Sequence, residues 1–75
     1  MAEKRNQEFI KKFGKNLKKK RKSLNVTQEK LCELSGLALS QVGRIERGKI
    51  NTSLDIIKTI ADSLNIEVFE LFDFN

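Results

Sequence analysis

The sequence predicts an all-α domain made of five short helices. Apolar residues recur every three or four positions along most of the chain, as on one face of a helix, and no stretch alternates polar and apolar residues as a half-buried strand would. Glycine or asparagine follows several of these periodic stretches, where a helix can end in the left-handed conformation. Seventy-five residues are enough for one domain with a small core, so we expect a single domain over residues 1–75.

The first helix is expected from about Asn6 to Ser23. Phe9, Phe13 and Leu17 recur every four residues and define its inner face. Gly14 lies within this pattern and should weaken the helix by about 1 kcal/mol relative to alanine. Residues 1–5 are expected to fray.

The second helix is expected from Gln28 to Ser35. Thr27 is suited to cap its start, because a threonine hydroxyl can accept a hydrogen bond from an amide of the first turn. Gly36 can take the left-handed conformation that ends a helix. The side chains expected to be buried are Leu31, Cys32 and Leu34.

The third helix is expected from Leu39 to Arg47, with Val42 and Ile45 facing inward and Gly48 ending it. Two short helices joined by a turn of three or four residues containing glycine form a helix-turn-helix, here over residues 27–47. The second helix of this motif can lie in the major groove of DNA.

The fourth helix is expected from Ser53 to Leu64, and Asn65 can end it. The sequence Thr52-x-x-Asp55 resembles a capping box at its start. Its inward stripe is expected to be Leu54, Ile57, Ala61 and Leu64. A last short helix over residues 67–72 completes the domain.

The formal net charge of +5 is distributed unevenly along the chain. It is +8 over residues 1–26, +1 over residues 27–53 and −4 over residues 54–75. A basic domain of this size favours a nucleic acid as partner. The alternative for the lysine run at residues 18–20 is a solvated helix face. The sequence leaves open whether the lysines of the first helix touch phosphates or only raise non-specific affinity.

Several classes of function are disfavoured by composition. The chain has no histidine, no nucleophile beside a base, no glycine-rich phosphate loop and no metal-ligand cluster, so we expect neither an enzyme nor a bound metal or cofactor. Its one cysteine, Cys32, cannot form an internal disulfide and is expected to pack as a small apolar residue rather than act as a redox switch or metal ligand. We also expect no membrane span, no signal segment and a cytoplasmic location.

Many residues of this helical pattern occur together, in order, in a known family. They are Leu17, Arg21, Thr27, Gln28, Leu31, residues 35–37, Val42, residues 45–49, residues 53–55 and residues 61–64. In these residues the sequence resembles the phage-repressor/Cro-like (Xre family) helix-turn-helix DNA-binding domains, from about Phe13 to Phe72. The resemblance implies a compact five-helix, lambda-repressor-like fold.

The resemblance also implies a function. It predicts a sequence-specific regulator of transcription that binds double-stranded DNA as a homodimer on a (pseudo)palindromic operator. We expect a stand-alone phage-type repressor or a restriction–modification controller protein. Such a protein would need no small-molecule ligand and would associate with the nucleoid when bound to its operator. The alternative is a protein-interaction module, antitoxin-like or an adaptor, that keeps the fold with weak base readout.

The resemblance assigns roles to individual positions. The residues expected to contact base edges are Leu39, Ser40, Gln41, Gly43 and Arg44. The residues expected to contact phosphates are Gln28, Arg47, Lys49, Asn51 and Thr52. Among them Arg44 is the strongest candidate for a specific contact, because arginine can bind guanine O6 and N7 together. Arg21 and Glu46 are expected to pair and to hold the recognition helix at its docking angle; the alternative is two solvated surface charges.

This sequence departs from the family pattern on the expected base-reading face. Ala38 cannot cap the third helix with its side chain, Leu39 replaces a residue that is often polar, and Gly43 offers no side chain. Specificity should therefore depend more on Arg44, on flanking contacts and on DNA shape.

The C-terminal end, residues 66–75, is dense in apolar side chains. A helix of about six residues cannot turn them all inward, so we expect some to face a second copy of the chain. The alternative is that all of them close the core. The residues expected at this dimer interface are Ile50, Val68, Phe69, Phe72 and Phe74.

Overall fold

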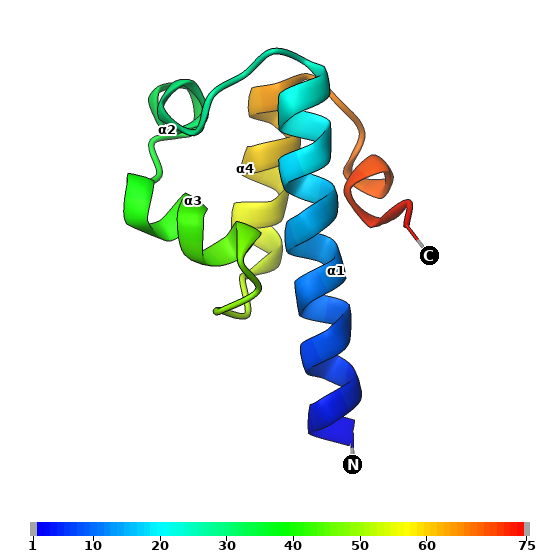
Figure 1. Ribbon diagram of the computed structural model, residues 1–75. Coiled ribbons are helices and arrows are strands. Elements are labelled where there is room, and N and C mark those ends of the chain that lie inside the picture. The colour runs from blue at the N-terminus through cyan, green and yellow to red at the C-terminus, as the bar shows by residue number, and fades with distance from the viewer. Residues whose placement is uncertain (1, 75) are drawn as a thin grey trace.

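The computed structural model describes the backbone of residues 2–74 and the side chains of residues 6–74. It contains α1 (Ala2–Ser23), α2 (Gln28–Ser35), α3 (Leu39–Glu46), α4 (Leu54–Leu64) and a 3-10 helix, η1 (Val68–Phe72). The prediction of an all-α fold is confirmed, with no strand in the described residues. Helix α1 runs the length of the molecule, with α2 and α3 to one side, η1 to the other, and its first turns projecting beyond the body (Figure 1).

The core lies where α1 and α4 face the other elements. Its most deeply buried large side chains are Leu17, Leu31, Val42, Ile45, Ile60 and Leu71, each from a stripe with helical spacing. The buried Asn16 side chain of α1 donates hydrogen bonds to the carbonyl oxygens of Glu70 (3.0 Å) and Leu71 (2.9 Å). These two bonds attach the C-terminal 3-10 helix to the middle of α1.

Local signals set most helix ends. The Thr27 hydroxyl accepts from the Lys30 amide at 3.0 Å, and Gly36 and Asn65 end their helices with φ of +80° and +57°. At other ends the predicted bounds shift. Helix α1 begins four residues before the predicted start, α3 ends one residue earlier because Arg47 is its C-cap, and the last helix is a 3-10 helix.

The predicted capping box at Thr52 is wrong. Helix α4 begins one residue later, and the Ser53 hydroxyl accepts from the Ile56 amide at 3.2 Å. The Thr52 hydroxyl is instead buried with no hydrogen-bond partner among the described residues. Serine is a better N-cap than threonine, and the adjacent Ser53 takes this role while the Thr52 hydroxyl is buried.

Three side chains predicted to face inward are exposed. Leu34 is 49% exposed because the covered stripe of α2 passes through Gln28, Leu31 and Ser35, which leaves Leu34 to the side. Leu54 is 83% exposed at the first position of α4, although Ile57, three residues later on the same stripe, is buried. Phe9 is half-exposed, and its ring packs only against those of Phe72 and Phe74 among the aromatic rings of the described residues.

Candidate nucleic-acid interface

Helix α3, the second helix of the helix-turn-helix, packs directly on the backbone of α1. A Cβ atom built on Gly14 of α1 would lie 2.6 Å from the carbonyl oxygen of Glu46 and closer still to that of Ile45. Only a residue without a side chain permits this approach, so Gly14 brings the C-terminal end of α3 against α1.

A buried ion pair ties the same two helices together. Arg21 of α1 donates from Nε to Glu46 Oε2 at 2.6 Å and from Nη2 to Glu46 Oε1 at 3.0 Å, and both residues are almost fully buried. A third guanidinium nitrogen donates to the Val26 carbonyl at 2.8 Å. The hydrogen bonds that Arg21 donates to Glu46 raise the pKa of Arg21 against the opposing effect of burial. Because two parallel hydrogen bonds join the guanidinium to the carboxylate, this pair fixes the rotation of α3 about its own axis.

Gln28, a predicted phosphate contact at the start of α2, is engaged in the same network. Its side-chain amide donates to Glu46 Oε1 at 2.9 Å. Helices α1, α2 and α3 are therefore joined at one carboxylate. In this structure Gln28 is directed to Glu46, and it would have to share or exchange that bond to meet a phosphate.

The outer face of α3 carries several of the predicted base contacts. Leu39, Ser40 and Arg44 are exposed, while Gln41 is half-buried at the flank. Val42 and Ile45 point into the core on the opposite side. The helix thus presents an arginine, a hydroxyl and an apolar side chain on a rigidly held surface.

The prediction that Gly43 is exposed is wrong. Gly43 is buried because the guanidinium of Arg47, four residues later on the same face, covers it. A Cβ atom at position 43 would lie 3.0 Å from Arg47 Nη1. The outer face of α3 therefore carries two guanidinium groups, those of Arg44 and Arg47, and the second covers the position where Gly43 has no side chain. The sequence signal for this contact is that Gly43 and Arg47 are four positions apart, which places them on the same face of the helix.

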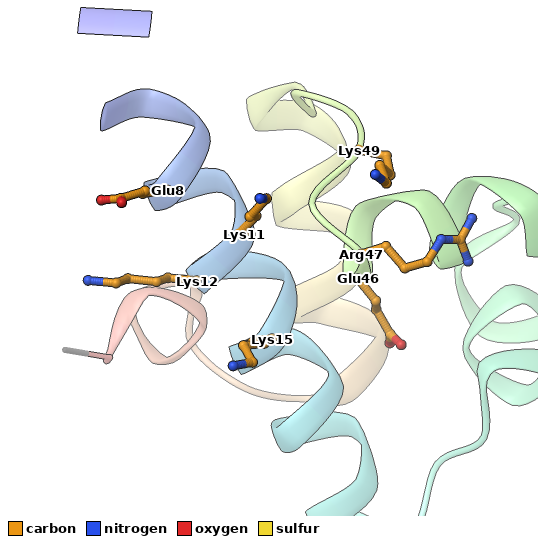
Figure 2. A pocket seen from close by; sticks show the side chains of 7 residues that line it. All are labelled: Glu8, Lys11, Lys12, Lys15, Glu46, Arg47 and Lys49. Atoms are coloured by element: carbon orange, nitrogen blue, oxygen red, sulfur yellow. The ribbon is translucent and has the colours of Figure 1, made fainter. Parts of the chain in front are cut away.

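The loop after α3 carries two further predicted phosphate contacts, Lys49 and Asn51, and both are exposed. Gly48 takes a φ of +69° and lets this loop turn against α1. Figure 2 shows Lys49 on the loop and the Arg47 guanidinium extending back along α3. The hydroxyl of Thr52, the remaining predicted phosphate contact in this loop, is buried in this structure and has no hydrogen-bond partner among the described residues.

The apolar C-terminal end is only partly turned inward. The Phe72 ring lies 4.9 Å from that of Phe13 and 6.1 Å from that of Phe9, and Phe74 lies 5.5 Å from Phe9. Phe9 was not among the predicted interface residues. Ile50 and Val68 are half-buried, whereas Phe69 is 69% exposed.

Two other features bear on the class of site. No group of three or more histidine, cysteine or acidic side chains that could hold a metal occurs among the residues whose side chains are described. None of the described helices is both long enough and apolar enough to span a membrane.

The fold and this surface define a helix-turn-helix protein whose recognition helix is held on α1 by a glycine contact and a buried ion pair. Residues 17–71 match the model of the helix-turn-helix family, and the chain belongs to that family.

Its relatives include several controller proteins. The crystal structure of the restriction-modification controller protein C.AhdI from Aeromonas hydrophila superposes with a TM-score of 0.82 at 46% identity, covering 84% of this chain and 96% of that one. Control protein C.BamHI of Bacillus amyloliquefaciens is 38% identical over 63 residues, 83% of this chain and 78% of its own. Control protein C.SmaI of Serratia marcescens is 35% identical over 59 residues, 79% and 70% of the two chains.

Fold, motif and relatives together make this chain a DNA-binding regulator of transcription rather than an enzyme.

Proposed function

We propose that this regulator binds a (pseudo)palindromic operator as a homodimer, in the manner of a stand-alone restriction–modification controller or phage-type repressor. The observation that carries the proposal is the exposed outer face of α3, which the Arg21–Glu46 pair and the Gly14 contact hold in one orientation. Similarity to controller proteins supports the choice of subclass. Bound to its operator, the protein would be associated with the nucleoid.

The exposed residues of α3 are suited to different kinds of contact. Arg44 can bind guanine O6 and N7 together, Ser40 can donate or accept, and Leu39 can pack on a thymine methyl group. Lys49 and Asn51 on the following loop are placed to hold phosphates beside the groove. Arg47 lies between these two groups, with its guanidinium over Gly43.

Replacing Arg44 with alanine is expected to weaken binding to the selected operator by 10- to 100-fold, equivalent to about 1–3 kcal/mol, and to relax preference at one base pair of each half-site. The fold should be unaffected, because the side chain is exposed. The measurement is selection of sites from a random duplex pool at two salt concentrations, followed by titration of the selected site. The matched control is Lys30→Ala, which removes one exposed cation outside the recognition helix.

Two outcomes would contradict base readout by α3. One is a selected pool without a two-fold symmetric sequence, with binding that falls steeply with salt for every duplex. The other is an Arg44→Ala protein with unchanged affinity and preference. Either result would favour the protein-interaction module over the operator-binding regulator.

The dimer is proposed to form through the C-terminal end, with Phe69 at its centre. Phe72 and Phe74 already pack on Phe9, so Phe69 is the aromatic side chain at this end left most exposed. Two-fold pairing of two such ends would bury these side chains together. The acidic charge of residues 54–75 suits an end that faces away from DNA.

Replacing Phe69 with lysine is expected to convert the dimer to a monomer at micromolar concentration, because a charge would be buried at the interface. Sedimentation velocity over a concentration series measures this directly. Leu24→Lys, a similar change at an exposed leucine just after α1, should leave the dimer intact. A Phe69→Lys protein that dimerises as strongly as wild type would place the interface elsewhere.

A further inference from the structure

A cleft of about 730 Å³ lies along the junction where the first half of α1 meets the C-terminal end of α3 and the loop that follows it. Its lining is Glu8, Lys11, Lys12, Lys15, Glu46, Arg47 and Lys49. Five of these seven residues are cationic. The roles proposed above for Arg47 and Lys49 do not involve α1. The cleft thus places the lysines of α1 beside residues of the expected DNA-binding surface.

The walls of the cleft are held by close backbone packing. A Cβ atom on Gly48 would lie 2.7 Å from both Cα and Cγ of Lys11, and one on Gly14 would meet the backbone at the end of α3. Two glycines, one on each wall, thus let α1 and the loop touch without intervening side chains. This close approach fixes Lys11 beside the loop that carries Lys49, so the cations are gathered by the fold and are not a chance run of surface lysines.

The charge inside the cleft is positive. The carboxylate of Glu46 is already neutralised by Arg21 and accepts a further hydrogen bond from Gln28. Figure 2 shows Lys11 directed from α1 toward the loop, whereas Glu8 points to the far side of α1. Lys12 points to the same side as Glu8, and the Arg47 guanidinium extends along α3 (Figure 2). The cations nearest each other across this space are Lys11 and Lys49, and Lys15 lines the cleft one turn further along α1.

Arg47 makes the cleft continuous with the recognition surface. It lines the cleft while its guanidinium covers Gly43 on the outer face of α3. A duplex docked on α3 carries about one negative charge per 1.7 Å of its axis. A backbone that follows the loop after α3 would therefore bring phosphates to the mouth of the cleft.

We propose that this cleft binds the phosphate backbone of the operator duplex, with Lys11 and Lys15 of α1 acting together with Lys49 of the loop. The proposal rests on the DNA-binding function proposed above and extends its contact surface to α1. It assigns a phosphate-binding role to two particular lysines among those of α1. The cleft contributes affinity without sequence preference, because phosphate contacts carry no base information.

The test compares the double variant Lys11→Gln/Lys15→Gln with Lys18→Gln/Lys19→Gln. Both remove two charges from exposed positions of α1, but the control lysines lie outside the cleft. Affinity is measured over a range of salt on the selected operator and on a random-sequence duplex. We expect the affinity of the cleft variant to fall about ten-fold on both duplexes. The slope of log K against log salt should fall by about 1–2, because each phosphate that a lysine neutralises adds roughly 0.9 to this slope. The control should change the slope by less than about 0.5.

The outcomes separate this proposal from the function on which it rests. Equal reductions in affinity for the two double variants would mean that the lysines act only through net charge and would overturn the cleft proposal, as would no reduction in either. Stabilisation of the free protein by pyrophosphate, removed by Lys11→Gln/Lys15→Gln without any effect on DNA, would assign the cleft to a free anion. A wild-type protein with no preference for the selected duplex would instead count against operator readout, whatever the lysine variants do.

Discussion

Replacing Glu46 with alanine is expected to lower the free energy of unfolding by about 3–5 kcal/mol, because it leaves the buried guanidinium of Arg21 without its counter-charge. The same change removes the acceptor of Gln28 and so disconnects α2 from α3. A domain of this class has a total stability of only about 5–15 kcal/mol, so the variant will be close to unfolding. Urea denaturation followed by circular dichroism measures the decrease.

Two companion variants make this result interpretable. Glu46→Gln keeps the size and one acceptor oxygen and should be less destabilised than Glu46→Ala. Glu33→Ala removes one partner of an exposed pair, Lys30–Glu33 at 2.9 Å, and should cost about 0.5 kcal/mol or less. A Glu46→Ala protein within about 1 kcal/mol of wild type would show that the pair is not a structural tie.

The pH dependence of this pair follows from the pKa of Arg21, which Glu46 raises above its ordinary value. Because the pKa of Arg21 is higher in the folded protein than in the unfolded chain, the charged guanidinium stabilises the fold fully at every pH below the unfolded-state pKa. This stabilisation is lost only as the pH rises through the folded-state pKa. For an arginine both values lie at strongly alkaline pH. Titration of Arg21 should therefore leave stability unchanged through the neutral range.

Replacing Gly14 with alanine is expected to destabilise the protein by about 3 kcal/mol, although alanine is the better helix former by about 1 kcal/mol. The new methyl group would meet the backbone carbonyl oxygens of Ile45 and Glu46, which cannot move without displacing α3. Thermal and urea unfolding of the variant measure the change. Because α3 would shift, DNA affinity should fall as well.

The matched control is Gly43→Ala, also a glycine in a helix. There the added Cβ would meet only the end of the flexible Arg47 side chain, at 3.0 Å. We expect this variant to gain up to about 1 kcal/mol, as helix propensity dictates. If Gly14→Ala were instead as stable as Gly43→Ala, the close packing of α1 on α3 would be wrong.

The local features of this fold could be read from short segments of sequence. Thr27, Gly36 and Asn65 mark helix ends because a side-chain oxygen or a left-handed residue satisfies backbone groups only a few residues away. The core residues Leu17, Ile45 and Ile57 followed from helical spacing. The family resemblance then added the helix-turn-helix and its class of function, which the family match confirms.

The burial and the contacts of individual side chains could not be predicted from short segments of sequence. Leu34 and Leu54 fit an apolar stripe, yet they are exposed because burial depends on which neighbouring helix covers each turn. Gly43 was expected at the surface, yet the Arg47 side chain covers it. The rotamer of a long side chain is set by the contacts available to it, which the spacing of residues does not specify.

The helices, most of their ends, the uneven charge and the family follow from the order of residues along the chain, because each depends on local hydrogen bonding, on composition or on short motifs. It is the packing of the helices that makes Gly14 a contact point rather than a weak position in α1, and that brings Gln28 and Arg21 together at Glu46. The same packing places Lys11 and Lys49 in the lining of one cleft although 38 positions separate them in the chain. These relations join distant segments, and their energies depend on distances of a few ångströms that exist only once the helices have packed.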